Sequence, residues 1–237
     1  GFLCYSVFQQ LNNALLKQQD PFAAIPLDAA IILESNELQQ VWSTFSETNL
    51  IWKEFLANEK VNSIDVRFKK VDSIISETSA LQRLFIDKNT VISVHPYSET
   101  YDFLTVTNCE LIDYESVVDF FNSIAKKSST INIKSSGFIE LSIDSSKYFV
   151  SYQEPFFLLT SSEELMNKSV LQLKSNTNLL ANTTFSQLRL SASPSSNFHL
   201  FFQKKQLTRF LNNFFNEQFV SQISNSNEFL DWIELDL

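Results

Sequence analysis

The sequence predicts an α+β fold: an antiparallel or mixed sheet with helices packed mainly on one face. Three observations lead to this class. Apolar residues first recur every three to four positions, as on the buried face of a helix. In residues 91–108 and again in residues 130–160 they recur at every second position, as in strands. Apolar residues make up 44% of the chain and charged residues 19%, which is a globular composition.

The first part of the chain is predicted to be mainly helical. Residues 2–19 form an amphipathic helix that ends at Asp20-Pro21. The short apolar run from Ala29 to Glu34 predicts a buried strand, and Ser35 or Asn36 caps the helix that follows. That helix carries Leu38, Val41, Trp42 and Phe45 on one face, and further helical stretches are predicted over residues 50–56, 64–75 and 81–85.

The middle of the chain is predicted to be rich in strands. Val91–His95 and Tyr101–Asn108 have the pattern of a hairpin around residues 96–100. A helix begins at Asp113, and its basic C-terminal end suits the helix dipole. Four more strands are then predicted: Thr130–Lys134, Phe138–Ile143, Tyr148–Tyr152 and Phe156–Thr160.

The last part of the chain alternates between helix and strand. Ser161-Ser162-Glu163-Glu164 is a capping-box start for a helix through about Leu173. The remaining predicted elements are a helix at 184–190, a strand at Phe198–Phe202, a one-faced helix over Leu207–Phe214 and a strand at Asp231–Leu237.

Two regions are expected. Residues 1–24 form an N-terminal helix, the remnant of a signal or membrane anchor or the tether to one, and residues 25–237 form the α+β domain. Residues 29–45 and 198–214 also align as strand, polar turn and helix, which predicts repeat units starting near 26 and 195. The alternative is that such units look alike for generic reasons. The chain is expected to be a fragment of a longer protein.

Composition excludes several classes of function. Gly137 is the only glycine after Gly1, so the glycine-rich loops that hold phosphate groups or dinucleotides are absent. The net charge is −9, and the four arginines (Arg67, Arg83, Arg189 and Arg209) are scattered. We therefore expect no binding to nucleic acid. No cofactor is predicted.

Cysteine and histidine give no catalytic or metal signature. Cys4 and Cys109 are too few for a disulfide scaffold and too far apart for a zinc site, and whether they pair stays open. His95 and His199 have no acidic or histidine neighbour at ligand spacing, which favours structural or surface roles. A Cys109–His95 dyad is disfavoured because the predicted hairpin separates the two by roughly 20 Å.

Carboxylates are numerous, and paired acids of a hydrolase remain an alternative. Their simpler interpretation is structural: Glu163 and Glu164 charge a helix N-terminus, while Asp231, Glu234 and Asp236 alternate with apolar residues on a half-exposed strand. No catalytic or metal-binding residue is therefore predicted.

Aromatic residues provide the candidate binding site. Several of the 23 phenylalanines occur as adjacent pairs, and neighbours on a strand point to opposite faces. The pairs fit a sheet covered on both faces. The functional alternative is an open apolar groove or interface. Its candidate residues are Tyr97, Tyr101, Tyr148, Tyr152, Phe156, Phe157 and Trp232.

Four segments carry a resemblance to a protein family: residues 25–34 (IPLDAAIILE), residues 49–56 (NLIWKEFL), Val94-His95-Pro96 and residues 231–236 (DWIELD). They resemble a group of long, uncharacterised exported proteins of the Bacteroidetes. The resemblance implies an N-terminal anchor or signal, a periplasmic or otherwise envelope-associated location, and no site residues.

The preferred function from sequence is a non-enzymatic binding or interaction module of the cell envelope. Its expected partner is an envelope protein or an apolar ligand, with membrane contact only through a removed N-terminal anchor. The alternatives are a carboxylate-based hydrolase and an architectural spacer in a larger repeat-built exported protein. The sequence leaves the oligomeric state open.

Overall fold

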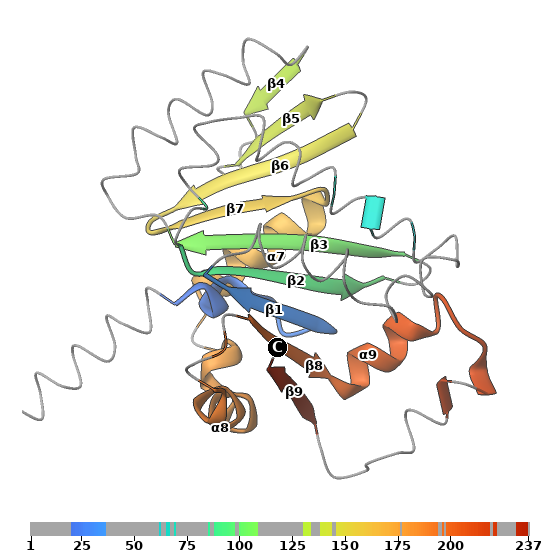
Figure 1. The fold of residues 1–237 in the computed structure, drawn as a ribbon. Coiled ribbons are helices and arrows are strands. Elements are labelled where there is room, and N and C mark those ends of the chain that lie inside the picture. Colours follow the sequence, from blue (N-terminus) through green and yellow to red (C-terminus); the bar gives the residue numbers. More distant parts are fainter. Residues whose placement is uncertain are drawn as a thin grey trace, which may run out of the picture.

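A nine-stranded antiparallel sheet organises the part of the chain that the computed structural model describes (Figure 1). The strand order is β4-β5-β6-β7-β3-β2-β1-β8-β9. The strands are β1 Ile31–Ser35, β2 Thr90–Pro96, β3 Tyr101–Asn108, β4 Thr130–Ile133, β5 Ile139–Ile143, β6 Ser146–Gln153, β7 Phe156–Thr160, β8 Phe198–Gln203 and β9 Trp232–Asp236. The described residues are 20–36, 62, 65, 66, 69, 85, 88–97, 100–108, 130–133, 138–143, 146–175, 177–193, 196, 198–218, 220, 221 and 231–236.

One face of the sheet is covered by two α-helices and two 3-10 helices. These are η1 Pro21–Ala24, α7 Glu163–Leu173, η3 Leu179–Ala181 and α8 Thr183–Ser191. Helix α7 begins where the sequence predicts, because the Ser162 hydroxyl accepts a hydrogen bond from the Leu165 amide at 3.3 Å. The Ser169 hydroxyl donates to the Ala24 carbonyl at 2.7 Å and fixes α7 to η1.

The main hydrophobic core lies between these helices and the sheet. Four aromatic rings fill the part of it beneath α8. Phe185 of α8 lies 5.3 Å from Phe22, 5.3 Å from Phe201 and 4.8 Å from Trp232, measured between ring centroids. The cluster joins η1, β8 and β9 to α8, elements that are far apart in the sequence.

The opposite face carries a second, smaller cluster. Helix α9 (Lys204–Leu211) places Phe210 against Tyr101 of β3, at 5.7 Å between ring centroids, and in one cluster with Val94 of β2. On the same side Phe157 contacts Phe85 at 6.1 Å, whereas its neighbour Phe156 belongs to the main core. Strand β7 is therefore buried on both faces.

The predicted α+β class with an antiparallel sheet is confirmed. The hairpin is also confirmed, since Val91 pairs with Val106 and His95 with Asp102. His95 lies near the turn, as the argument against a dyad requires, and Cys109 lies outside the described residues. Also outside them are Cys4, the N-terminal helix over 2–19, and the helix that begins at Asp113.

Two predictions about the organisation of the chain involve segments that the structure describes only in part. Residues 21–24, grouped from sequence with the N-terminal helix, form η1, and all four are buried in the domain core. The two strands of the proposed repeat, β1 and β8, are antiparallel neighbours in which Ile32 pairs with Phe201. The segment from residue 37 to residue 45 that completes the first repeat unit lies outside the described residues.

Within the described residues, no helix has the length and hydropathy to cross a bilayer.

Candidate functional site

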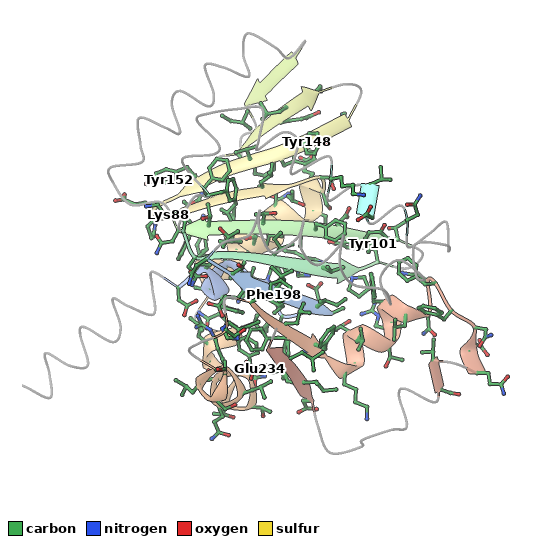
Figure 2. All side chains as sticks on the ribbon, in the orientation of Figure 1. Lys88, Tyr101, Tyr148, Tyr152, Phe198 and Glu234 are labelled. Atoms are coloured by element: carbon green, nitrogen blue, oxygen red, sulfur yellow. The ribbon has the colours of Figure 1, made fainter. Side chains whose placement is uncertain are left out.

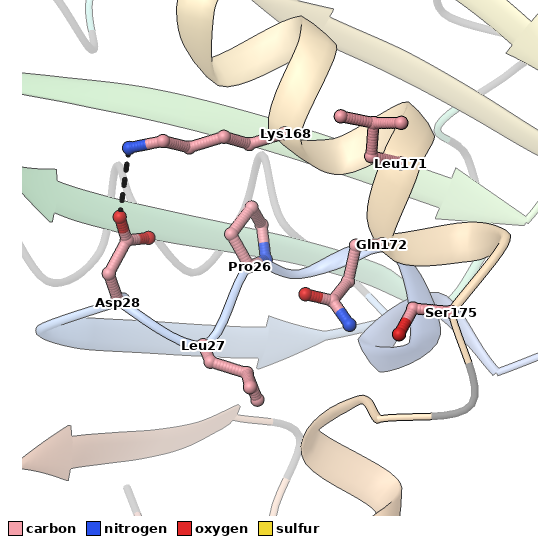
Figure 3. Close-up of a pocket in the computed structure, with 7 residues that line it drawn as sticks. All are labelled: Pro26, Leu27, Asp28, Lys168, Leu171, Gln172 and Ser175. Atoms are coloured by element: carbon pink, nitrogen blue, oxygen red, sulfur yellow. Dashed lines mark hydrogen bonds and ion pairs between the residues drawn. The ribbon is translucent and has the colours of Figure 1, made fainter.

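A shallow hollow of about 370 Å³ lies between helix α7 and the turn that joins η1 to β1 (Figure 3). Two large apolar side chains in its wall face solvent: Leu27 is 43% exposed and Leu171 is 66% exposed. Exposed leucines are common singly, and these two line the same depression, one from the turn and one from α7 (Figure 3). The lining residues are Pro26, Leu27, Asp28, Lys168, Leu171, Gln172 and Ser175.

The turn that forms one wall of the hollow is held by a hydrogen bond within it and by the side chain of Gln203 from β8. The Ala29 amide donates to the Pro26 carbonyl at 3.3 Å, closing the turn. The side-chain amide of Gln203, oriented with its nitrogen toward the turn, donates to the carbonyls of Leu27 at 3.2 Å and Ala29 at 2.9 Å. The hollow is thus built on a fixed backbone.

Asp28 joins the two walls and connects them to the interior. Its Oδ2 accepts from the Lys168 ammonium of α7 at 3.1 Å, the contact drawn as a dashed line in Figure 3. Its Oδ1 contacts Nδ1 of His95 at 2.7 Å. Lys168 also pairs with Glu164 at 3.0 Å and lies 5.0 Å from the centre of the Tyr97 ring.

The contact with Asp28 assigns a proton to Nδ1 of His95. An ionised carboxylate only accepts hydrogen bonds, so Nδ1 carries the proton. Nε2 of the neutral ring is then the acceptor, and the Ser93 hydroxyl, 2.9 Å away, donates to it. Ser93, His95 and Asp28 form a continuous hydrogen-bonded chain.

This chain has the order of a serine hydrolase triad, but its nucleophile is enclosed. Ser93 and His95 are both 0% exposed. Together with Val91 they occupy every second position of β2 and lie on the face of the sheet that the main core covers. A nucleophile must contact the reacting carbon, and substrate has no path to Ser93 in this arrangement. The hydrogen-bonded series Ser93–His95–Asp28 therefore acts as a structural support that orients the Asp28 carboxylate.

Two pKa shifts follow from this arrangement. Burial alone would raise the pKa of Asp28, but the contacts with His95 and Lys168 outweigh it and hold the pKa well below its usual range. Burial lowers the pKa of His95, and the neighbouring Asp28 offsets only part of that effect. Asp28 is thus ionised and His95 neutral at pH 7.

The lowered pKa of His95 predicts how stability changes with pH. An unfolded histidine titrates at about pH 6.5, above the folded value, so the unfolded chain binds the proton first on acidification. The free energy of unfolding should fall below about pH 6.5, with His95 contributing at most about 1.4 kcal/mol per pH unit. Urea unfolding of His95→Gln between about pH 7.5 and 5.5 should show a flatter dependence than wild type. His199→Gln controls for loss of a histidine, and an equally flat profile there would contradict the assignment.

A second charged cluster lies at the other end of β1. The Arg189 guanidinium of α8 donates from Nη2 to Oε1 of Glu34 at 2.8 Å and from Nη1 to Oδ2 of Asp20. Its Cζ atom lies 4.2 Å from the centre of the Phe22 ring. The four arginines are scattered along the sequence, but the fold gives Arg189 two carboxylate partners, Asp20 and Glu34.

Chain comparisons identify no family. No family model and no curated protein matches this chain. Two solved structures of TP0453, a Treponema protein, are similar to it. Crystal form III has 14% identity, a TM-score of 0.38 and coverage of 81% of this chain and 66% of that one. Crystal form IV has 16% identity, a TM-score of 0.40 and coverage of 84% and 70%. At these TM-scores the likeness supports no argument about function.

The aromatic residues proposed from sequence do not form one exposed site. Three of them, Tyr101 on β3 and Tyr148 and Tyr152 on β6, are labelled in Figure 2 and lie apart from one another. Five of them are buried: Tyr101, Tyr148, Phe156, Phe157 and Trp232. They occupy separate positions, with Trp232 and Phe156 in the main core and Tyr101 under α9 on the opposite face. Tyr152 is partly buried on β6, and Tyr97 is the one that approaches the hollow, through its contact with Lys168.

The carboxylates weighed as hydrolase candidates occupy two places. Glu163 and Glu164 lie in the first turn of α7, as expected. Glu234 of β9 lies 3.7 Å from Nδ1 of His199, and Asp236 pairs in register with His199. No group of three or more histidine, cysteine, aspartate or glutamate side chains suited to a metal occurs within the described ranges.

Sequence reasoning missed the residues of the hollow. Asp28 lies 67 positions before His95 and 140 before Lys168, so no local spacing connects them. The pairing of β1 with β2 brings Asp28 to His95, and the packing of α7 on η1 brings Lys168 to Asp28. Only the turn residues Ile25-Pro26-Leu27-Asp28 gave a signal in the sequence, as a connection between elements.

Proposed function

We propose that this protein is a non-enzymatic interaction module of the cell envelope, and that the hollow receives a side chain of a partner protein against its apolar wall. The observation that carries the proposal is the pair of solvent-exposed leucines, Leu27 and Leu171, in the wall of a preformed depression. Burial of such side chains against a partner is favourable by about 25 cal/mol per Å² of apolar surface.

The fixed walls of the hollow support a binding role. Gln203 holds the turn, and two contacts hold α7 beside it: Ser169 with Ala24, and Lys168 with Asp28. A surface that is already ordered loses little conformational freedom when a partner docks. The Ser93–His95–Asp28 chain belongs to this support.

The envelope location rests on the sequence resemblance to exported proteins given above. A partner protein is favoured over a small ligand because the hollow is shallow and open on one side. Small-molecule sites usually enclose most of the ligand surface.

Native mass spectrometry of the protein with solubilised envelope of its source organism tests the proposal. We expect a protein-sized adduct for wild type, and loss of at least nine tenths of it in the double variant Leu27→Gln/Leu171→Gln. Leu190→Gln is the matched control, because Leu190 is 87% exposed and lies on α8 rather than at the hollow. A bare 27.3 kDa species for wild type, or an adduct that all variants retain, would reject the proposal.

A further inference from the structure

The charged end of the hollow carries a surplus of negative charge. Asp28 and Lys168 line this end of the hollow, and Glu164 lies beside them, outside its lining; the single ammonium of Lys168 contacts both carboxylates, at 3.1 and 3.0 Å. Glu164 remains 65% exposed and Asp28 35% exposed at the side chain, so both carboxylates also face solvent. The local net charge is −1, in the same sense as the −9 of the whole chain.

Lys168 forms ion pairs with both of these carboxylates. Burial would lower the pKa of Lys168, but its hydrogen bonds to Glu164 and Asp28 raise it well above the usual value, so the ammonium stays protonated. Its charge is already matched by two opposite charges and by the Tyr97 ring at 5.0 Å. An anionic group arriving at this end would meet two carboxylates for one ammonium, which is repulsive.

The apolar wall adjoins this acidic end. Leu27 and Leu171 line the same depression as Asp28 and Lys168. A side chain that complements both parts needs an alkyl stem and a cationic head. Arginine has this form: its stem packs on apolar surface, and its planar guanidinium donates to two carboxylate oxygens at once. The guanidinium is also more weakly hydrated than an ammonium and so costs less to dock.

We infer that the hollow binds an arginine side chain of a partner protein, with the alkyl stem on Leu27 and Leu171 and the guanidinium at the Asp28 and Glu164 carboxylates. This inference rests on the proposed function and specifies the chemistry of the partner. Attraction between the acidic end and the cation should also weaken as salt is added.

Methyl NMR with short peptides tests the inference. The probe is acetyl-Ala-Ala-Arg-Ala-Ala-amide, and its control replaces arginine by citrulline, which has the same shape without the charge. We expect the arginine peptide to shift the Leu27 and Leu171 methyl signals but not those of Leu190, and to bind at least tenfold more tightly than the citrulline peptide. Glu164→Gln should weaken binding of the arginine peptide several-fold, whereas Glu163→Gln, on the same exposed helical turn, should not.

The possible results of the peptide experiment distinguish failure of the arginine inference from failure of the proposed function. Equal binding of the arginine and citrulline peptides, or no shift with arginine, would overturn the inference. A leucine peptide that shifts the same methyl signals when the arginine peptide does not would leave the apolar hollow in place and reject the cationic partner. Absence of any shift with both the arginine and the leucine peptide would count against the inference and the proposed function.

Discussion

Replacement of Arg189 by methionine is expected to lower the free energy of unfolding by about 3 kcal/mol. The guanidinium is 24% exposed at the side chain, and its partners Asp20 and Glu34 are 18% and 13% exposed. Methionine retains much of the side-chain volume but leaves two poorly solvated carboxylates facing each other. Breaking a buried pair in this way costs more than the pair contributes, because the remaining charges keep their desolvation penalty.

The pH dependence of this variant gives a second readout. Burial already raises the pKa of Asp20, even with the Arg189 guanidinium opposing it. Without the guanidinium the pKa rises further, so the cost of the substitution should shrink as the pH approaches the range where Asp20 takes up a proton. Urea unfolding of Arg189→Met at about pH 7 and pH 4.5 measures both effects.

Arg209→Met is the matched control for this prediction. Arg209 is exposed on α9, and its guanidinium donates a hydrogen bond to the side chain of Gln206 at 3.0 Å. Exposed changes of this kind usually alter stability by less than about 0.5 kcal/mol. Equal losses in the two variants would contradict the structural role assigned to the Arg189 cluster.

Truncation of Phe185 to alanine is expected to cost about 4 kcal/mol. Phe185 is fully buried, and its ring contacts Phe22, Phe201 and Trp232. The loss combines transfer of the removed atoms to water with a cavity that three rings from separate elements cannot easily fill. Thermal and chemical unfolding would measure it.

Leu190→Ala supplies the comparison on the same helix. It removes an apolar side chain that is 87% exposed, so the change should stay within about 0.5 kcal/mol of wild type. A Phe185→Ala protein as stable as Leu190→Ala would show that the cluster beneath α8 is not a determinant of stability.

Local patterns predicted many elements of this fold because local physics determines them. Ser162 followed by Glu163 and Glu164 predicted the start of α7, where the hydroxyl of Ser162 caps the first turn. Period-two apolar residues around a proline-containing turn predicted the β2–β3 hairpin. The order of the strands in the sheet could not be predicted from local patterns. Strand β1 pairs with β2 and β8, and those pairings depend on contacts between residues far apart in the sequence.

The candidate site was not predicted, for a related reason. Adjacent rings such as Phe156 and Phe157 fit a strand covered on both faces, and both sides of β7 are indeed covered and both rings buried. The alternative, an open aromatic groove, included these two buried rings. Asp28 and Lys168 are ordinary surface charges in the sequence. Their importance comes from the turn and the helix that place them at one depression, and from the buried His95 that orients the carboxylate.

The most direct test of the central claim is site-specific photocrosslinking at the hollow. A photoreactive phenylalanine analogue would replace Leu171 in one protein and Leu190 in another, and both would be illuminated with the source organism's envelope fraction. We expect one discrete protein adduct from position 171 and none from position 190, since only the former lines the hollow. The same adduct from both positions, or from position 190 alone, would contradict the assignment of the hollow as the binding surface.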